Sequence, residues 1–186
     1  MAVTLFVTED YIKTHTVIDD QVDAKTLMVV VADAQQLYIE PLLGTRLYDK
    51  LKTEVVANTL AGNYLTLMNT YVVPTLLKWI VHDWTPLNHF RLRNVGTTTK
   101  NGEFGSSASR SDLTFRMGLA ENKANLIGMK MIDYLECNTA LFPEYCTNDL
   151  GGELQPKNSA TSTGIYLGQS KKYYGNDNKK YLPDNL

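Results

Sequence analysis

Seven apolar residues in the second half of the chain constrain the fold most strongly. They recur at alternating spacings of four and three without a miss: Leu113, Met117, Ala120, Ala124, Ile127, Met131 and Tyr134. This spacing places all seven on one face of an α-helix and is typical of a helix that packs along another helix. Ser111 and Asp112 provide a helix start before the run. The sequence therefore predicts one long helix, with Ile127 and Met131 at the centre of its buried face.

Helix signals also fill the first half of the chain. Thr8 precedes two acidic residues and predicts a short helix over residues 7–14. Apolar residues at helical spacing predict a second helix over 22–39, which we expect Pro41 and Gly44 to end. Thr45 is positioned to cap a short helix through Val55.

A long apolar face follows a predicted turn at residues 58–63 and extends from Tyr64 to Trp84. Pro74 lies within it, so either one helix kinks there or two helices meet with Pro74 in the first turn of the second. Pro86 is expected to end the segment. The β-branched run at residues 29–31 lies within a helical period, so it does not predict a strand. The fold class is therefore all-α, a bundle of four or five helices.

Two segments lack any periodic apolar face. Residues 95–111 are rich in Gly, Ser and Thr and are predicted to form a long flexible loop between helices. Residues 151–186 contain Gly, Asn, Ser, Lys and Tyr and almost no aliphatic residues, so they are predicted to form an extended C-terminal arm. The domain organisation is then a helical bundle over residues 1–150 followed by this arm.

Charge and composition disfavour several classes of function. The arm carries five lysines and three acidic residues, which leaves 13 basic and 17 acidic residues in positions 1–150, a mildly acidic body. Neither part has the basic stripe of a nucleic-acid surface. The chain has no apolar run long enough to span a membrane and no signal-peptide pattern at its start, so we expect synthesis in the cytoplasm and no membrane partner.

No residue set predicts catalysis, a metal or a cofactor. Cys137 and Cys146 are too few for a zinc site, and the three histidines are far apart in the sequence. His82 is interpreted as a partly buried structural histidine rather than a general base. We therefore expect a protein that is not an enzyme and that acts by binding other proteins.

Two groups of residues are candidates for contact with partners. Tyrosines and lysine pairs in the arm are predicted to dock it on a partner: Tyr166, Lys171, Lys172, Tyr173, Tyr174 and Tyr181. Residues in and beside the loop are predicted to face a channel or a neighbouring subunit: Arg91, Arg93, Lys100, Phe104 and Arg110. An alternative function uses Arg91, Arg93 and the loop to hold nucleic acid, as a cytosolic helical binding or regulatory module.

The segment Asp33-Ala-Gln-Gln-Leu-Tyr-Ile-Glu-Pro-Leu-Leu-Gly-Thr-Arg-Leu-Tyr-Asp-Lys-Leu51, preceded by Ile18-Asp-Asp-Gln-Val-Asp23, resembles the N-terminal part of head–tail connector (adaptor) proteins of tailed bacteriophages, crAss-like phages above all. Further similarity lies in Tyr64-Leu-Thr-Leu-Met, Tyr71-Val-Val-Pro74, the Gly/Ser-rich loop and Phe142-Pro143-Glu-Tyr145. The resemblance covers most of residues 5–146.

This resemblance implies a virion structural protein at the portal vertex. Such a subunit forms a ring, expected as a dodecamer, beneath the portal protein, where it extends the DNA channel and supports tail attachment. Its implied partners are copies of itself, the portal protein, an adjacent tail or ring protein, and DNA in transient passage through the channel. The long loop would face the channel or a neighbour, and the C-terminal arm would dock on the portal or an adjacent ring.

Overall fold

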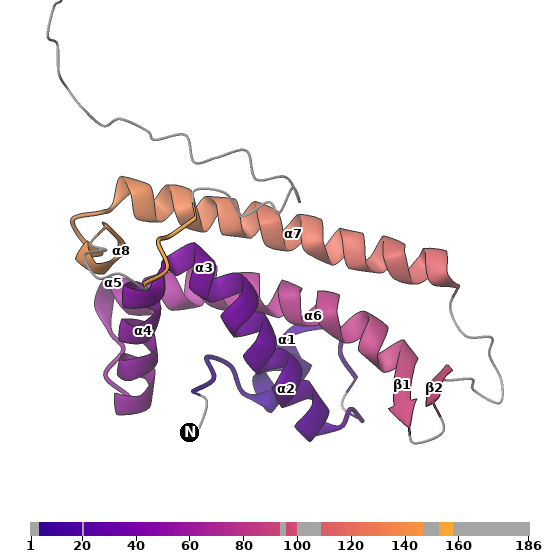
Figure 1. Cartoon of the computed structure of the whole chain (residues 1–186). Helices are drawn as coiled ribbons and strands as arrows, with labels where there is room; N and C mark the ends of the chain where they lie inside the picture. The colour runs from indigo at the N-terminus through magenta and orange to yellow at the C-terminus, as the bar shows by residue number, and fades with distance from the viewer. Residues whose placement is uncertain (1–3, 20, 94–95, 100–108, 147–152, 158–186) are drawn as a thin grey trace, which may run out of the picture.

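The computed structural model describes residues 4–19, 21–93, 96–99, 109–146 and 153–157, and for residues 90–93, 96–99 and 146 it describes the backbone alone. The described chain is a bundle of helices with one short hairpin (Figure 1), which confirms the predicted all-α class. In chain order its elements are α1 (Glu9–His15), α2 (Ala24–Ala34), η1 (Gln35–Ile39), α3 (Glu40–Leu43), α4 (Thr45–Ala57), α5 (Gly62–Leu67), η2 (Met68–Val72), α6 (Val73–His89), β1 (Phe90–Arg93), β2 (Gly96–Thr99), α7 (Arg110–Cys137) and α8 (Pro143–Cys146).

Side chains cap the helix starts largely where the sequence indicates. Thr8 accepts a hydrogen bond from the backbone of Tyr11 and caps α1, as predicted. Asp23 caps α2 by accepting from the backbone of Thr26. Asn58 ends α4 in the left-handed conformation, with φ of 54°, which confirms the predicted turn there.

Two prolines lie inside continuous helices, where the sequence predicted breaks or left a choice open. Pro41 does not end its helix, because α2, η1 and α3 form one continuous helix that ends at Gly44. Pro74 likewise lies in one continuous helix made of α5, η2 and α6. Both prolines follow a five-residue π-turn by one residue, and the N–H of Glu40 and Val73 bonds five residues back, to Gln35 and Met68. This wider turn relieves the clash with the preceding carbonyl that a regular α-helix imposes on proline.

The end of α6 also differs from the prediction. Pro86 does not end the helix, which continues to His89 and passes directly into a hairpin. In this hairpin β1 pairs antiparallel with β2, from Phe90 opposite Thr99 to Arg93 opposite Gly96. Part of the predicted loop is therefore a strand, because Thr97, Thr98 and Thr99 form a β-branched run that suits a ladder.

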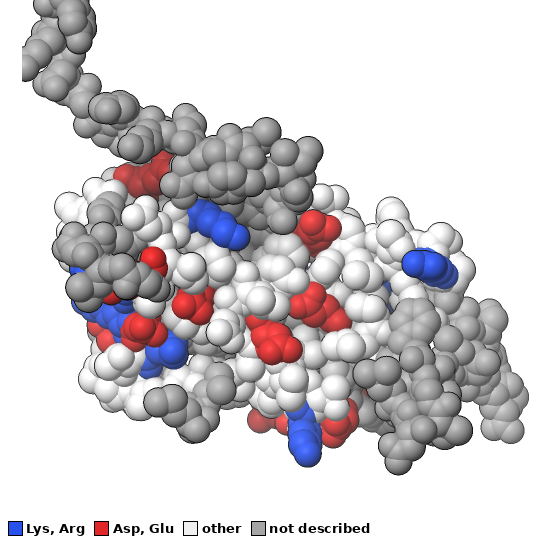
Figure 2. Space-filling view, viewed as in Figure 1, with Lys and Arg blue, Asp and Glu red and all other residues white. Residues whose placement is uncertain are grey.

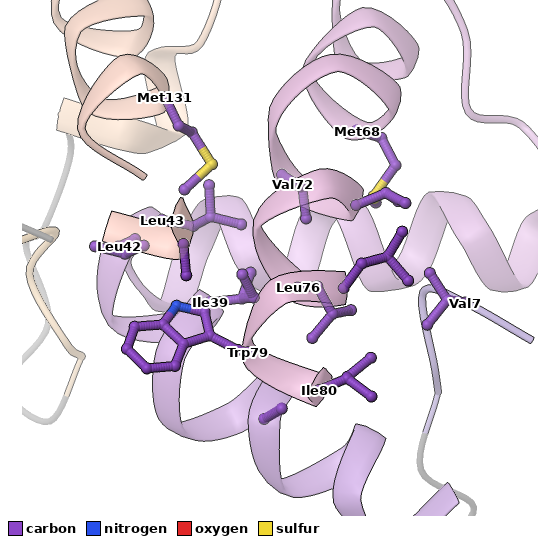
Figure 3. Close-up of a cluster of buried hydrophobic side chains, with 14 of the residues drawn as sticks. Val7, Ile39, Leu42, Leu43, Met68, Val72, Leu76, Trp79, Ile80 and Met131 are labelled. Atoms are coloured by element: carbon purple, nitrogen blue, oxygen red, sulfur yellow. The ribbon is translucent and has the colours of Figure 1, made fainter. Parts of the chain in front are cut away.

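The core forms around α6. In Figure 1, α7 runs along one side of α6 and α2 along the other, and both helices pack against it. Figure 3 shows buried side chains from the N-terminal segment, η1, α3, η2, α6 and α7: Val7, Ile39, Leu42, Leu43, Met68, Val72, Leu76, Trp79, Ile80 and Met131. Leu141 to Pro143 were predicted to close the body, and Phe142 is fully buried.

One polar side chain is built into this core. Gln35 is 1% exposed, yet every polar group of its amide has a partner. Its oxygen accepts from the Phe6 backbone, and its nitrogen donates to the Thr4 carbonyl and the Tyr48 hydroxyl. Gln35 thus joins the N-terminal segment to η1 and α4.

The long helix α7 confirms the prediction with two corrections. It begins at Arg110, where Ser109 and Asp112 cap each other, rather than after Ser111 and Asp112. Its buried residues are Leu113, Ala120, Ala124, Gly128, Met131, Ile132 and Leu135. Ile127 is only half-buried, because a straight helix has 3.6 residues per turn and drifts away from a strict seven-residue repeat. Met131, fully buried, is the centre of the packed face.

Candidate interaction surface

Helix α7 carries a second apolar face that points away from the bundle. Phe115, Leu119 and Leu126 are 73%, 47% and 66% exposed. Their spacing of four and seven residues places them on one line along the helix, opposite the buried face. We call these three residues the α7 ridge. Large apolar side chains in a line on a surface are typical of a contact with another protein.

A row of basic residues borders the α7 ridge. Arg116, Lys123 and Lys130 are exposed and follow one another at intervals of seven residues, so they lie on one flank of the helix. Residues two apart on a helix point about 200° away from each other, so Glu121 lies on nearly the opposite flank from Lys123. Helix α7 is therefore basic on one side of its ridge and bears Glu121 on the other.

On the Glu121 side, aromatic packing joins η1 to α6. The Tyr38 and Trp79 side chains stack with ring centroids 3.9 Å apart and an interplanar angle of 2°. The Tyr38 hydroxyl donates to Asp83 at 3.1 Å, and the same carboxylate oxygen lies 2.7 Å from Nδ1 of His82. Burial, then the charge and hydrogen bond of Asp83 and the charge of Glu121, raise the pKa of Tyr38 to about 12. His82 is half-buried here, as predicted.

Acidic side chains surround the stacked Tyr38 and Trp79 rings. Leu37, 63% exposed, precedes Tyr38 on the helix surface, with Asp33 four residues before it and Glu40 three residues after it. Asp83 bonds Tyr38, and Glu121 lies close enough to influence it. Figure 2, viewed onto α2 and α3, shows acidic side chains across the middle of this side of the molecule. We call Asp33, Leu37, Glu40, Asp83 and Glu121 the acidic face.

A carboxylate on α8, Glu144, links the end of the bundle formed by α4, α5 and α8. Glu144 pairs with Lys50 of α4 at 2.6 Å and accepts from the Tyr64 hydroxyl of α5 at 2.8 Å. Burial by itself would raise the pKa of Glu144, but the hydrogen bonds from Lys50 and Tyr64 outweigh it and lower that pKa. Hydrogen bonding of Lys50 to Glu144, and then to Tyr64, raises the pKa of Lys50. Glu144 thus joins three helices.

Five residues of the predicted arm lie on the body. The segment 153–157, here called the strap, runs over the corner between α3 and α4, where Gly44 has φ of 76°. Thr45 and Leu154 exchange two hydrogen bonds, and the Lys157 N–H donates to the Pro41 carbonyl at 2.9 Å. Thr45 therefore binds the strap and is not the cap of α4 that the sequence predicted. A Cβ on Gly44 would lie 2.9 Å from Pro156, so only glycine fits under the strap.

The predicted contact residues divide between places inside and outside the described chain. Arg91 and Arg93 lie in β1, opposite Thr98 and Gly96, and Arg110 is the exposed first residue of α7. Lys100 and Phe104 lie outside the described residues, as do all six docking residues of the arm, Tyr166, Lys171, Lys172, Tyr173, Tyr174 and Tyr181. Within the described ranges, no three His, Cys, Asp or Glu side chains lie together in a group that could hold a metal, and no helix is long and apolar enough to cross a membrane.

Sequence reasoning missed both the α7 ridge and the acidic face. The sequence could have predicted the ridge, because Phe115, Leu119 and Leu126 recur at helical spacing within the segment that was predicted to form the long helix. A helix with apolar residues on two opposite faces is already a sign of two contacts. The acidic face had no such signal, since it joins residues from α2, η1, α3, α6 and α7 that only the fold brings together.

The comparison with protein families places this chain in one of them. A family of unknown function (DUF6712) matches residues 39–153, which is more than half of the chain, so the chain belongs to that family. The matched region begins in η1, contains α3 to α8, and ends at Glu153 in the strap, which pairs with Arg46 at 2.7 Å. No curated protein and no solved structure is significantly similar to the chain.

Proposed function

We propose that this member of the DUF6712 family is a virion structural protein, the head–tail connector (adaptor) subunit of a tailed bacteriophage. In this proposal it forms a ring beneath the portal protein that extends the DNA channel and supports tail attachment. The observation that carries the proposal is the α7 ridge, a line of exposed apolar side chains on a helix whose other face already fills the core. A subunit that functions only in an assembly needs such a second face.

The corner at Pro41 to Gly44, part of the segment that resembles connectors, supports the proposal further. The strap is held over this corner by backbone hydrogen bonds and by the Arg46–Glu153 pair. Lys157, the last described residue of the strap, is therefore fixed to the body. Residues 158–186, fully extended, could reach roughly 100 Å, which is far enough to cross a neighbouring subunit or to meet the portal.

Imaging tests this function directly. Negative-stain electron microscopy of the purified full chain, alone and mixed with a portal protein of a related phage, should show closed rings or rings seated on the portal. A chain that stays monomeric or dimeric in both samples and instead binds DNA would contradict the proposal. That result would favour the regulatory module that contacts nucleic acid through Arg91 and Arg93.

The arm has its own test. Removal of residues 164–186 should leave a folded protein, because the strap and every buried residue of the described core lie before this point. We propose that Tyr166, Tyr173, Tyr174 and Tyr181 anchor the arm and that the lysine pairs select an acidic partner surface. The truncated chain should lose portal binding in a pull-down assay. Binding at the affinity of the full chain would show that the arm is not the docking element.

A further inference from the structure

The α7 ridge and the acidic face have opposite charge and lie on different sides of one molecule. The ridge is bordered by Arg116, Lys123 and Lys130. The acidic face surrounds an exposed leucine, Leu37, with carboxylates at Asp33 and Glu40. The exposed Asp112 and Asp133 lie at the two ends of the ridge, seven residues before Leu119 and seven after Leu126. The basic row between them, on one flank, is opposite in charge to the acidic face, and opposite charges steer and align two proteins.

The two surfaces do not face each other within one chain. The basic row lies on the flank of α7 opposite Glu121. The basic flank thus points away from the side on which Glu121, Tyr38 and Asp83 meet. A single copy cannot bring its own basic row onto its own acidic face.

We propose that the α7 ridge with its basic row binds the acidic face of a second copy of this chain. Each copy then uses one surface as donor and the other as acceptor, which is a head-to-tail contact. Head-to-tail contacts produce closed rings when the rotation between copies closes and open filaments when it does not. This inference rests on the proposed ring and names the two surfaces that would form it.

The charges favour head-to-tail pairing over pairing of two α7 ridges. Two α7 ridges packed against each other in antiparallel orientation would bring Lys123 and Lys130 of one copy beside those of the other, and like charges oppose such pairing. Lysine against Asp33 or Glu40 is favourable. Rim charges of this kind act through solvent, so the association should weaken as salt is raised.

A pair of complementary variants tests the inference. Lys123→Glu with Lys130→Glu reverses the basic row, and Asp33→Lys with Glu40→Lys reverses the acidic face. Each variant should lose self-association by at least about tenfold, because like charges at a rim oppose docking. Lys25→Glu, an exposed lysine at the start of α2, is the control and should associate as the wild type does. Sedimentation velocity of the full-length proteins measures all four.

Mixing the two variants gives the decisive result. Each retains one intact surface, and the two reversed surfaces are again opposite in charge, so the mixture should regain the self-association that each variant alone has lost. A mixture that stays monomeric while the wild type associates would overturn the head-to-tail pairing. Variants that both associate normally would overturn the choice of surfaces, and so would a wild-type chain that remains monomeric at the highest soluble concentration.

The C-terminal segment of the same chain is the other occupant that the test can reveal. If the chain associates only after residues 158–186 are removed, those residues cover the α7 ridge and the inference is wrong. A different result would contradict the proposed function but not the pairing. Variants that associate on mixing, while the wild-type chain never closes into rings or binds a portal, would support the pairing and contradict the connector function.

Discussion

The two faces of α7 differ in what they contact: one packs against the bundle and the other faces solvent. The inner face buries Met131, Ile132 and Leu135 completely or nearly so against the rest of the bundle. The outer face leaves Phe115 and Leu126 more than half exposed. The same helix thus stabilises the fold through its inner face and leaves its outer face free to bind another protein. Substitutions on the inner face should therefore change stability, and substitutions on the outer face should change association.

The largest effect on stability is expected on the inner face. Met131→Ala removes a fully buried side chain at the centre of the core and should lower the free energy of unfolding by about 2–5 kcal/mol. Leu126→Ala, on the outer face, should change it by no more than about 0.5 kcal/mol. Chemical denaturation of both variants measures the contrast. Equal losses would mean that α7 does not have one structural and one exposed face.

A second effect is expected where the strap crosses the body. Gly44→Ala places a methyl group 2.9 Å from Pro156 on a backbone with φ of 76°, so it should cost about 1–3 kcal/mol. Gly62→Ala is the matched control, since Gly62 has φ of 57° but no atom within 4 Å of its added Cβ. Thermal unfolding should show the larger loss for Gly44→Ala. If deleting residues 153–186 leaves that difference unchanged, the strap does not cause it.

The carboxylate at the end of the bundle should give a smaller effect. Glu144→Gln loses the ion pair with Lys50 and should cost about 1 kcal/mol, since both groups are partly exposed to solvent. The lowered pKa of Glu144 means that its contribution is present above the unfolded value of 4.5 and is lost as pH falls through the folded value. The stability difference between wild type and Glu144→Gln should therefore vanish in acid. A difference that persists there would assign it to packing.

The smallest effect concerns Tyr38 on the acidic face. Its pKa rises from 10.0 to about 12 on folding, so the protonated hydroxyl stabilises the folded state below pH 10 and this contribution is lost as pH rises toward 12. Tyr38→Phe cannot ionise and should lack this part of the alkaline loss. Urea midpoints of both proteins between these pH values provide the measurement. Parallel curves would show that folding does not raise the pKa of Tyr38.

Several features of the fold followed from the sequence because they depend on local periodicity. The 4-3 spacing in α7, the Thr8 cap and the turn at Asn58 are properties of neighbouring residues. Pro41 was wrongly predicted to end its helix, and the choice at Pro74 stayed open, because a π-turn accommodates each ring and nothing in the local pattern indicates a π-turn. The hairpin at β1 and β2 is short and has little alternation to reveal it.

The candidate surfaces divide in the same way. The α7 ridge could have been predicted, because its spacing is present in one segment of sequence. The acidic face depends on the stacking of Tyr38 on Trp79, which joins residues far apart in the chain. The strap similarly depends on a contact between Leu154 and Thr45 across most of the sequence. Contacts between residues so far apart produce no periodic pattern in the sequence, so they could not be predicted from it.

The central claim is that the outer face of α7 serves association and the inner face serves folding. Sedimentation velocity of Leu126→Asp, with thermal unfolding of the same sample, tests it most directly. We expect a melting temperature within about 2 °C of the wild type, because a surface change costs little free energy, together with loss of self-association. A variant that still associates as the wild type does, or that unfolds many degrees earlier, would contradict the claim.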